Sequence, residues 1–595
     1  MIRTVQVVLL VSGLGAGAAA FAETPAWVTE SNQAAQKLLA VQAKYAPETV
    51  SAFGVEKYDA DVLDLKPGTV PRQEADLDAV AQEYTAELKD VRDPRVREDL
   101  EILIKSAQDQ RGTLALNERL MLPYFDLPQA LFTGFQTLLD KRTAKVRYPA
   151  ALVRLKRYTG AERGYEPITT LARARVEERF GDKLTAPWSV EVVEELKNQD
   201  QYVSGIRDLL QKSGLKGWEH DFATFSTQIA AYGVWVRASV LPRARASNLL
   251  PPEIYADNLK NFGVTMDPHE LMDRALFTFA QTRDEMQSLS VAIARQHGLQ
   301  SADYRDVIRE LKKAHIPNER LLEVYRERLA GIEKIVREQH LISLPERAAV
   351  IRLATPAESA AIPAPHLSIP RLIGNTGESG EFVLPTANPN AESKAEMDDF
   401  NYEAITWDLT AHEARPGHEL QFAAMIEGGV SVARALFAFN SANVEGWALY
   451  SEAIIKPYLT PEAQLAVLEA RLQRSARAFL DPMLNLGMLK PEQAKHFLME
   501  DVVLSEPLAK EEIDRYTFTA PGQATSYFFG YSKLQALRAK TELALGQKFR
   551  PQSYHDFIVA QGLLPPGVLE KAVMEGYVKP LQLAAAQARS DKADR

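Results

Sequence analysis

Residues 411–421 read Ala411-His412-Glu413-Ala414-Arg415-Pro416-Gly417-His418-Glu419-Leu420-Gln421, and the rest of the chain is best understood from this stretch. It places two imidazoles and an adjacent carboxylate within seven residues. Neutral imidazole nitrogens are good zinc ligands, and a neighbouring carboxylate can serve as the base that activates water at the metal. The stretch therefore predicts a hydrolytic zinc centre in which His412 and His418 bind one ion and Glu413 is the general base.

The spacing of the two histidines differs from that of the common zinc-peptidase motif H-E-x-x-H, whose histidines lie on one helical face. Here they are six positions apart, which on a regular helix separates them by about 240°. Pro416 lacks the N–H of a helical hydrogen bond, and Gly417 can adopt backbone angles closed to other residues. We therefore expect the helix to bulge, or to stop and restart with Pro416 in the first turn of a new helix, which returns His418 to His412.

A catalytic zinc ion commonly has three protein ligands and one open position. Glu445 is the leading candidate for the third ligand, because it lies on a second helical pattern 33 residues after His412. Glu452 is the alternative, since it lies about two turns further along the same helical face. Three neighbouring residues are more simply interpreted as core packing: Trp447, Leu449 and Tyr450.

Taken together, these motifs resemble a known family. His412-Glu413-x-x-Pro416-Gly417-His418-x-x-Gln421 and Glu445-Gly446-Trp447-x-x-Tyr450-x-Glu452 resemble the bacterial domain-of-unknown-function family 885 (DUF885), whose members are similar to gluzincin metallopeptidases. Residues 521–530 and the segment from Tyr554 to Pro565 also resemble that family's closing segment. The resemblance implies the same ligand set, with Glu445 as the third ligand. Position 419 departs from the family pattern, because it carries Glu where many relatives are expected to have a further histidine.

The resemblance also implies residues that stabilise the oxyanion formed when a carbonyl is attacked. Tyr527 and His555 are the candidates, because a tyrosine or histidine beyond the zinc helices has this role in similar gluzincins. The alternative for Tyr527 is core packing within its aromatic segment, and the alternative for His555 is a hydrogen bond to Asp556. One helical face carries further candidates for groups that support the ligands or bind a substrate carboxylate: Arg474, Arg477 and Asp481.

Residues 27–340 are expected to form a succession of helices. Asp93-Pro94 and Asp267-Pro268 are typical helix starts, because the N–H that proline lacks is unpaired in the first turn anyway. The pair His269-Glu270 also reads H-E, but no histidine follows four or six positions later. It is therefore interpreted as the exposed first turn of a helix rather than as a metal site.

Residues 342–397 are rich in proline, which excludes long helices. Residues 349–353 and 381–384 are predicted to be short strands. One interpretation is a surface connection. The other is a small sheet whose edge pairs with an extended peptide next to the metal.

Length and composition set the outer limits of the fold. A chain of 595 residues with 46% hydrophobic and 25% charged residues is ordinary for a globular protein and long enough for two helical lobes around a cleft. The predicted fold is mainly α, two-lobed and metallopeptidase-like, with a helical N-terminal lobe at 23–341 and a helical zinc-binding lobe at 398–595. A net charge of −10 gives no sign of a nucleic-acid-binding surface, so we expect no nucleic-acid partner.

The N-terminus is predicted to be a signal peptide, residues 1–22. Arg3 supplies the positive charge, an apolar run follows, and Ala20-Phe21-Ala22 is an A-x-A cleavage pattern. The run is shorter than the roughly 20 apolar residues that span a membrane, so we expect a periplasmic or secreted protein without a membrane anchor. The sequence contains no cysteine, which excludes a lipoprotein anchor, disulfides and thiolate chemistry.

These patterns predict a secreted zinc-dependent peptidase that takes short or flexible peptides into a cleft, because an extended chain must enter it. Two alternatives stay open. One is a zinc-dependent hydrolase of amide or ester bonds in cell-wall material or small molecules, which the same metal and base would serve. The other is a non-catalytic periplasmic binding protein that retains a metal fold. The sequence does not specify the oligomeric state.

Overall fold

The computed structural model describes residues 25–584 and 587, except 356, 357, 360, 361, 363 and 386–396. The predicted signal peptide, residues 1–22, lies outside the described residues. So does a part of the proline-rich connection at 342–397.

The described chain is mainly helical with one small sheet, which confirms the predicted fold class. The helices before the sheet are α1 (Ala26–Tyr45), α2 (Pro47–Ala52), α3 (Thr69–Glu87), α4 (Pro94–Leu120), α5 (Leu127–Leu138), α6 (Ala150–Thr159), α7 (Ile168–Glu177), α8 (Ser189–Ser213), α9 (Glu219–Trp235), α10 (Pro252–Asn261), α11 (Pro268–His297), α12 (Tyr304–Lys312) and α13 (Asn318–Glu338). Those after it are α15 (Ile405–Leu409), α16 (His418–Glu427), α17 (Ser441–Ile455), α18 (Pro461–Asn485), α19 (Pro491–Glu500), α20 (Glu506–Asp514), α21 (Thr525–Leu545), α22 (Pro551–Ala560) and α23 (Pro566–Val573).

Both predicted Asp-Pro helix starts are confirmed. Helix α4 begins at Pro94, and the side chain of Asp93 accepts a hydrogen bond from the backbone N–H of Arg95. Helix α11 begins at Pro268 and is capped by Asp267 in the same way. His269 lies exposed in the first turn of α11, as expected for an H-E pair outside a metal site.

The sheet has three strands, β1 (Val350–Leu353), β2 (His366–Ser368) and β3 (Glu381–Leu384). Strand β3 lies in the middle, parallel to β1 and antiparallel to β2, and its four residues are buried. The two predicted strands, β1 and β3, are therefore confirmed. Strand β2, which the sequence analysis did not predict, forms one edge of the sheet.

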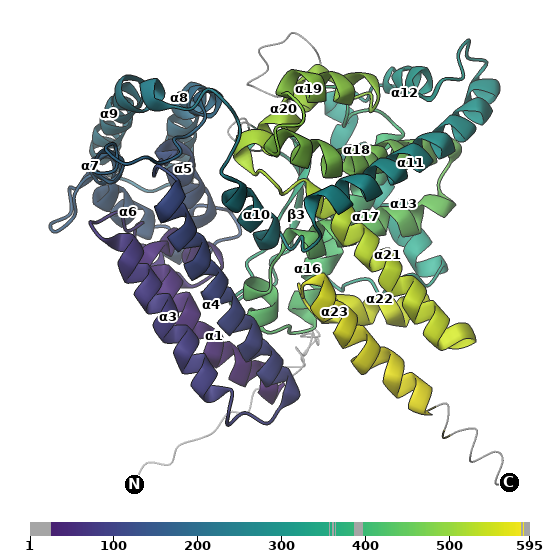
Figure 1. The fold of residues 1–595 in the computed structure, drawn as a ribbon, viewed down its shortest axis with the longest axis horizontal. Helices are drawn as coiled ribbons and strands as arrows, with labels where there is room; N and C mark the ends of the chain where they lie inside the picture. Colours follow the sequence, from purple (N-terminus) through teal and green to yellow (C-terminus); the bar gives the residue numbers. More distant parts are fainter. Residues whose placement is uncertain are drawn as a thin grey trace, which may run out of the picture.

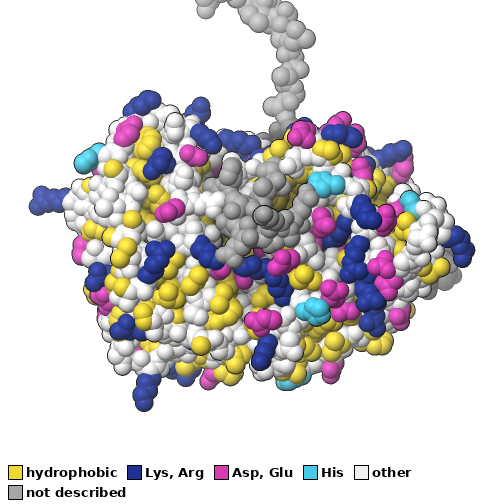
Figure 2. Space-filling model, turned by 90° about the horizontal axis from the view of Figure 1, so that it is seen from above, with side chains coloured by type: hydrophobic (Ala, Val, Ile, Leu, Met, Phe, Trp, Pro, Cys, Tyr) yellow, Lys and Arg dark blue, Asp and Glu magenta, His cyan; other side chains and the backbone are white. Residues whose placement is uncertain are grey.

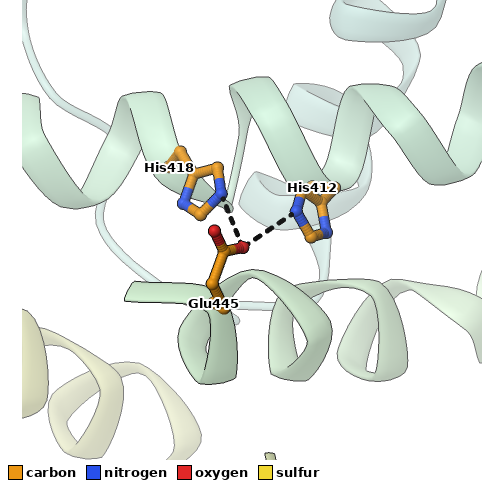
Figure 3. Close-up of side chains that lie close together, drawn as sticks. All are labelled: His412, His418 and Glu445. Carbon is orange, nitrogen blue, oxygen red and sulfur yellow. Dashed lines mark ion pairs between the residues drawn. The ribbon is translucent and has the colours of Figure 1, made fainter. Parts of the chain in front are cut away.

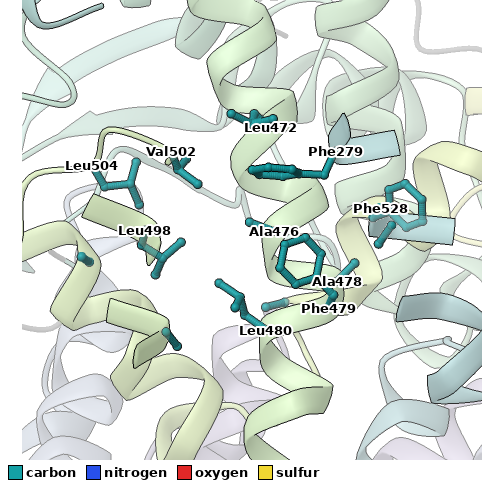
Figure 4. Close-up of a cluster of buried hydrophobic side chains, with 14 of the residues drawn as sticks. Phe279, Leu472, Ala476, Ala478, Phe479, Leu480, Leu498, Val502, Leu504 and Phe528 are labelled. Atoms are coloured by element: carbon teal, nitrogen blue, oxygen red, sulfur yellow. The ribbon is translucent and has the colours of Figure 1, made fainter. Parts of the chain in front are cut away.

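The helices fall into two groups on either side of α10 and β3 (Figure 1). One core lies entirely among residues 65–240, within the first group. A second core joins α10–α12 to helices of the C-terminal part of the chain, so helices before and after the sheet share it. Phe279 of α11 and Phe479 of α18 illustrate this packing, with ring centroids 5.6 Å apart; Figure 4 shows both among their neighbours. The long helix α18 is thereby fixed against α11.

A buried polar contact ties the first helices to the segment between α16 and α17. Asp99 of α4 accepts hydrogen bonds from the hydroxyls of Ser31 and Ser431, at 2.5 and 2.6 Å. Its other oxygen accepts from Nε of Arg434 at 2.7 Å. Because buried charged groups are stable only when paired, this network fixes α1 and α4 against the residues that connect the two helices carrying the candidate ligands.

On the face shown in Figure 2, acidic and basic side chains are interspersed and neither sign gathers into one patch. Among the described residues, no helix combines the length and the apolar character needed to cross a membrane.

Candidate metal centre

The helical segment 405–427 is interrupted near Pro416 and Gly417. Helix α15 runs into a π-helical turn, Thr410–Ala414, and the chain then becomes extended at Arg415 before α16 starts at His418. The helix thus bulges and also stops and restarts. The prediction that Pro416 lies in the first turn of the new helix is wrong, because Pro416 precedes Gly417, which is the N-cap residue of α16.

Only glycine fits at position 417. A Cβ atom there would lie 1.8 Å from the carbonyl oxygen of His412 and 2.4 Å from that of Ala411. Two stretches of backbone therefore touch where the chain turns from the π-helical turn into α16. This close approach brings His418 back beside His412.

Side chains from both sides hold the turn in place. The indole Nε1 of Trp447, on α17, donates a hydrogen bond to the carbonyl oxygen of Pro416 at 2.9 Å. Arg415, which is 3% exposed, donates to Glu419 at 2.7 Å and to Glu333 at 2.8 Å. Trp447 was predicted to be a core residue. It is buried, and its hydrogen bond to Pro416 also stabilises the turn. The unexpected Glu419 is the buried partner of Arg415.

His412, His418 and Glu445 converge on one point (Figure 3). Oε2 of Glu445 lies 3.6 Å from Nε2 of His412 and 3.4 Å from Nε2 of His418, and one potential ligand atom from each residue lies within 4.8 Å of the others. Ligands about 2.1 Å from a tetrahedral ion are about 3.4 Å apart. The buried Oε2 has no hydrogen-bond partner among the described residues. The three residues therefore fit a zinc ion by spacing and by chemistry.

Glu452, the alternative third ligand, contacts the other face of His412. Its Oε1 lies 2.6 Å from Nδ1 of His412, and because a carboxylate can only accept, Nδ1 carries the proton. In the neutral form of His412 that binds a metal, Nε2 then has its lone pair on the side of Glu445. A carboxylate that fixes the tautomer of a histidine in this way is typical of metal-binding histidines. Glu452 is thus placed as a support for His412.

The charges of the three groups depend on one another. Burial alone would lower the pKa of His412, but the nearby carboxylates of Glu445 and Glu452 raise it to about 10. Burial disfavours the charge of Glu445, yet the two imidazoles hold its pKa well below the ordinary value. Zinc binds neutral imidazole, so an ion held at these residues would displace the proton on Nε2 of His412.

Glu413 and Tyr527 line a cavity of about 90 Å³ together with His412. Oε1 of Glu413 lies 3.9 Å from Nε2 of His412. The rings of Tyr527 and His412 are nearly parallel, with centroids 6.4 Å apart. Burial and the charge of Glu445 raise the pKa of Tyr527, so its hydroxyl keeps its proton. The structure therefore brings together five of the six predicted site residues, namely His412, Glu413, His418, Glu445 and Tyr527.

Two glycines bring Tyr527 to the cluster. Gly446 of α17 and Gly530 of α21 face each other where the helices cross, and a Cβ on Gly530 would lie 1.8 Å from the carbonyl oxygen of Ala442. Glu445 precedes the first glycine, and Tyr527 lies one turn before the second. This crossing was not predicted, although both glycines lie in the motif segments 445–452 and 521–530.

Comparison with known protein families assigns the chain to one of them. A family described as "Bacterial protein of unknown function (DUF885)" matches residues 47–573. The chain belongs to the DUF885 family. No curated protein matches it. The similarity of DUF885 proteins to gluzincin metallopeptidases, which the resemblance implied, stays a prediction.

Two solved structures share the fold of this DUF885 chain. A "putative lipoprotein" from Colwellia psychrerythraea aligns with a TM-score of 0.74 and 19% identity, over 92% of this chain and 97% of that one. A second, of unknown function, from Shewanella oneidensis aligns with a TM-score of 0.68 and 19% identity, over 92% of this chain and 100% of that one. At these identities the likeness shows the fold alone.

The structure does not place His555 in the cavity beside the candidate metal centre of this DUF885 protein. The side chain is fully buried. Its Nδ1 lies 2.7 Å from the carbonyl oxygen of Leu341, so Nδ1 donates. Its Nε2 lies 2.8 Å from the hydroxyl of Tyr450, which therefore donates to it; that hydroxyl also accepts from Arg538 at 3.2 Å. Both ring nitrogens of His555 are thus engaged in the core.

We expect His555 to make the DUF885 fold sensitive to acid. Burial lowers its pKa to about 4, below the roughly 6.5 of an unfolded chain. The unfolded state then binds the proton more tightly, so stability present above pH 6.5 is lost as the pH falls to 4, by roughly 3 kcal/mol. Urea unfolding at pH 6.5 and 4.0 should show a smaller loss for His555→Gln than for wild type. The exposed His269→Gln is the control, and equal losses in wild type and His555→Gln would contradict the assignment.

Gly417→Ala should disrupt the turn of the DUF885 motif. The new Cβ would collide with backbone rather than with a movable side chain, so the turn must shift, at a cost of about 3 kcal/mol. We expect a lower melting temperature and weaker zinc binding in a chelator titration. Gly112→Ala is the matched control, because its Cβ would meet nothing within 4 Å. An unchanged zinc affinity in Gly417→Ala would show that the close approach does not position His418.

Proposed function

We propose that this DUF885 protein is a zinc-dependent peptidase that hydrolyses short or flexible peptides. The observation that carries the proposal is the convergence of His412, His418 and Glu445 within 4.8 Å, with Glu413 beside them on a cavity. A structural zinc site usually has four protein ligands, whereas a catalytic site has three and leaves one position open. Three candidate ligands and an adjacent unbound carboxylate fit the catalytic class.

The residues around the site have distinct tasks in the proposed reaction. Zinc bound there would polarise the carbonyl of the substrate and the attacking water. The carboxylate of Glu413 takes a proton from that water and returns it to the leaving nitrogen, as general base and then general acid. The hydroxyl of Tyr527, kept protonated by burial, donates a hydrogen bond to the oxygen that becomes negative. Glu452 holds His412 in the required tautomer.

The edge of the sheet supports an extended peptide as the substrate. Ala364 and Pro365 line the cavity that contains Glu413, and strand β2 follows directly at His366. Strand β2 is at an edge of the sheet, a position where another chain can pair, although the carbonyl oxygen of Ser368 already accepts a hydrogen bond from Arg142 at 3.1 Å. This favours the predicted sheet beside the metal over a plain surface connection, and a peptide over a compact small molecule.

The test compares wild type and Glu413→Gln, both loaded with zinc, on a mixed peptide library read by mass spectrometry. We expect about one zinc ion in each protein and cleavage by wild type only. The position of the cuts would then define exopeptidase or endopeptidase action. If wild type holds zinc and cleaves no peptide, the peptidase proposal is wrong, and amide and ester substrates from cell-wall material become the next screen. If Glu413→Gln retains every activity of the protein, a binding function is favoured instead.

We also propose that the protein is exported. The A-x-A pattern at residues 20–22 supports this, and two solved structures with the same fold are each described as a "putative lipoprotein". This chain contains no cysteine, so it lacks the residue that carries a lipid in lipoproteins. N-terminal sequencing of the protein from a periplasmic fraction should give Glu23 as the first residue. An intact N-terminus on a cytoplasmic protein would contradict the export.

A further inference from the structure

Three arginines, Arg474, Arg477 and Arg515, line the cavity beside the candidate metal centre. They differ in how far their guanidinium groups are neutralised. Arg477 forms two parallel hydrogen bonds with Glu512, at 2.7 and 2.6 Å, and its guanidinium lies 4.5 Å from the ring centre of Tyr527. Arg477 is therefore satisfied within the protein, and it supports Tyr527.

The other two arginines keep unpaired N–H groups. Arg474 is 8% exposed, and its buried Nε has no hydrogen-bond partner among the described residues. The same holds for the buried Nη1 of Arg515, whose nearest ion-pair oxygen, on Glu512, is 3.8 Å away. A guanidinium group stays charged at any ordinary pH. Leaving its buried N–H groups unpaired is unfavourable, so this part of the cavity suits an anion.

The carboxylates nearby are largely engaged elsewhere. Asp399 lies 2.7 Å from Nζ of Lys312. Glu469 accepts a hydrogen bond from the hydroxyl of Tyr402 at 2.7 Å, and burial raises its pKa to about 7. Burial likewise raises the pKa of Glu511, near Arg515, to about 8, so this group carries little charge at neutral pH. Arg515 therefore shares the charge of Glu512 with Arg477, which binds both oxygens of that carboxylate.

We propose that Arg515, with Arg474, binds the free C-terminal carboxylate of the peptide, so that the enzyme acts as a carboxypeptidase. This inference rests on the proposed peptidase function. A guanidinium group and a carboxylate match in geometry and charge. Both arginines line the same cavity as Glu413 and Tyr527, so a carboxylate bound by the arginines would lie close to the general base. Because Glu413 lines the same cavity, the bond that is cut lies within one or two residues of the C-terminus.

The test uses three versions of one N-acetylated peptide with the zinc-loaded full-length protein: the free acid, its C-terminal amide, and an amide that ends in glutamate. Wild type should cleave the free acid with a kcat/KM at least about 30-fold higher than either amide, since an unpaired buried charge is costly. Arg515→Gln should raise KM for the free acid by a similar factor, so that the rates for acid and amide converge. Arg471→Gln is the matched control, because Arg471 is on α18 outside the cavity and stacks on Tyr531.

Zinc content and melting temperature establish that Arg515→Gln is folded. Equal cleavage of acid and amide by wild type would overturn the carboxylate site while leaving the peptidase function intact. The same conclusion follows if Arg515→Gln slows acid and amide equally. Rapid cleavage of the amide that ends in glutamate would assign the arginines to an acidic side chain and overturn the proposal. If zinc-loaded wild type cleaves none of the three peptides and no peptide of the library, the proposed peptidase function is wrong. The proposed carboxylate site is then wrong as well.

Discussion

Glu413→Gln should lower kcat of peptide hydrolysis by roughly 10³–10⁴-fold while zinc stays bound, because general acid–base catalysis contributes up to about that factor. The amide of glutamine has nearly the shape of the carboxylate but cannot accept a proton. Glu413 is not one of the three residues that converge as candidate ligands, and its Oε1 is 3.9 Å from Nε2 of His412. The measurement is single-turnover hydrolysis of a peptide identified in the library, with zinc determined by mass spectrometry on the same samples.

The chain supplies a matched control for this substitution. His269-Glu270 has the same two letters at the exposed start of α11, far from any predicted ligand in sequence. Glu270→Gln should leave kcat, KM and zinc content at wild-type values. Residual activity of Glu413→Gln close to that of wild type would exclude Glu413 as the general base, whatever the metal content.

Glu445→Gln should remove zinc from the protein. Oε2 of Glu445 is the atom that faces both imidazoles, at 3.6 and 3.4 Å, and it has no other partner in the described chain. A neutral amide loses the charge that offsets the ion. We expect zinc affinity, measured by competition with a chromogenic chelator, to fall by more than the roughly 10–100-fold that loss of an outer hydrogen-bond partner costs.

Glu452→Gln is the comparison that distinguishes the role of Glu452 from that of Glu445. It removes only the acceptor of the Nδ1 proton of His412, so we expect zinc affinity to fall by about 10–100-fold. The zinc site should still be occupied at excess metal, and activity should be recovered there. If Glu452→Gln abolishes zinc binding while Glu445→Gln keeps it, the two residues must exchange roles.

The helical framework followed from local signals. The starts of α4 and α11 were predictable because aspartate and proline act within one turn of the helix. The bulge and break near Pro416 were predictable because proline and glycine change the backbone directly. Strand β2 was missed, since it has three residues, lies between Pro365 and Pro370, and contains no β-branched residue. Its position depends on pairing with β3, which sequence periodicity does not record.

The residues of the candidate metal centre were predictable to different degrees. His412, His418 and Glu413 follow from one short stretch, and Glu445 follows from the ligand number and the resemblance. The roles of Trp447, Gly446 and Gly530 follow only from how the helices cross, because they act on backbone atoms distant in sequence. Arg515 was missed for the same reason: its unpaired Nη1 is visible only once the cavity has been formed.

The most direct test of the central claim is an anomalous difference map from a crystal of the zinc-loaded protein, collected on both sides of the zinc absorption edge. We predict one strong peak about 2.0–2.2 Å from Nε2 of His412, Nε2 of His418 and a carboxylate oxygen of Glu445. The peak should be absent from Glu445→Gln. Zinc bound elsewhere, or no peak at these three residues in protein that contains zinc, would contradict the account.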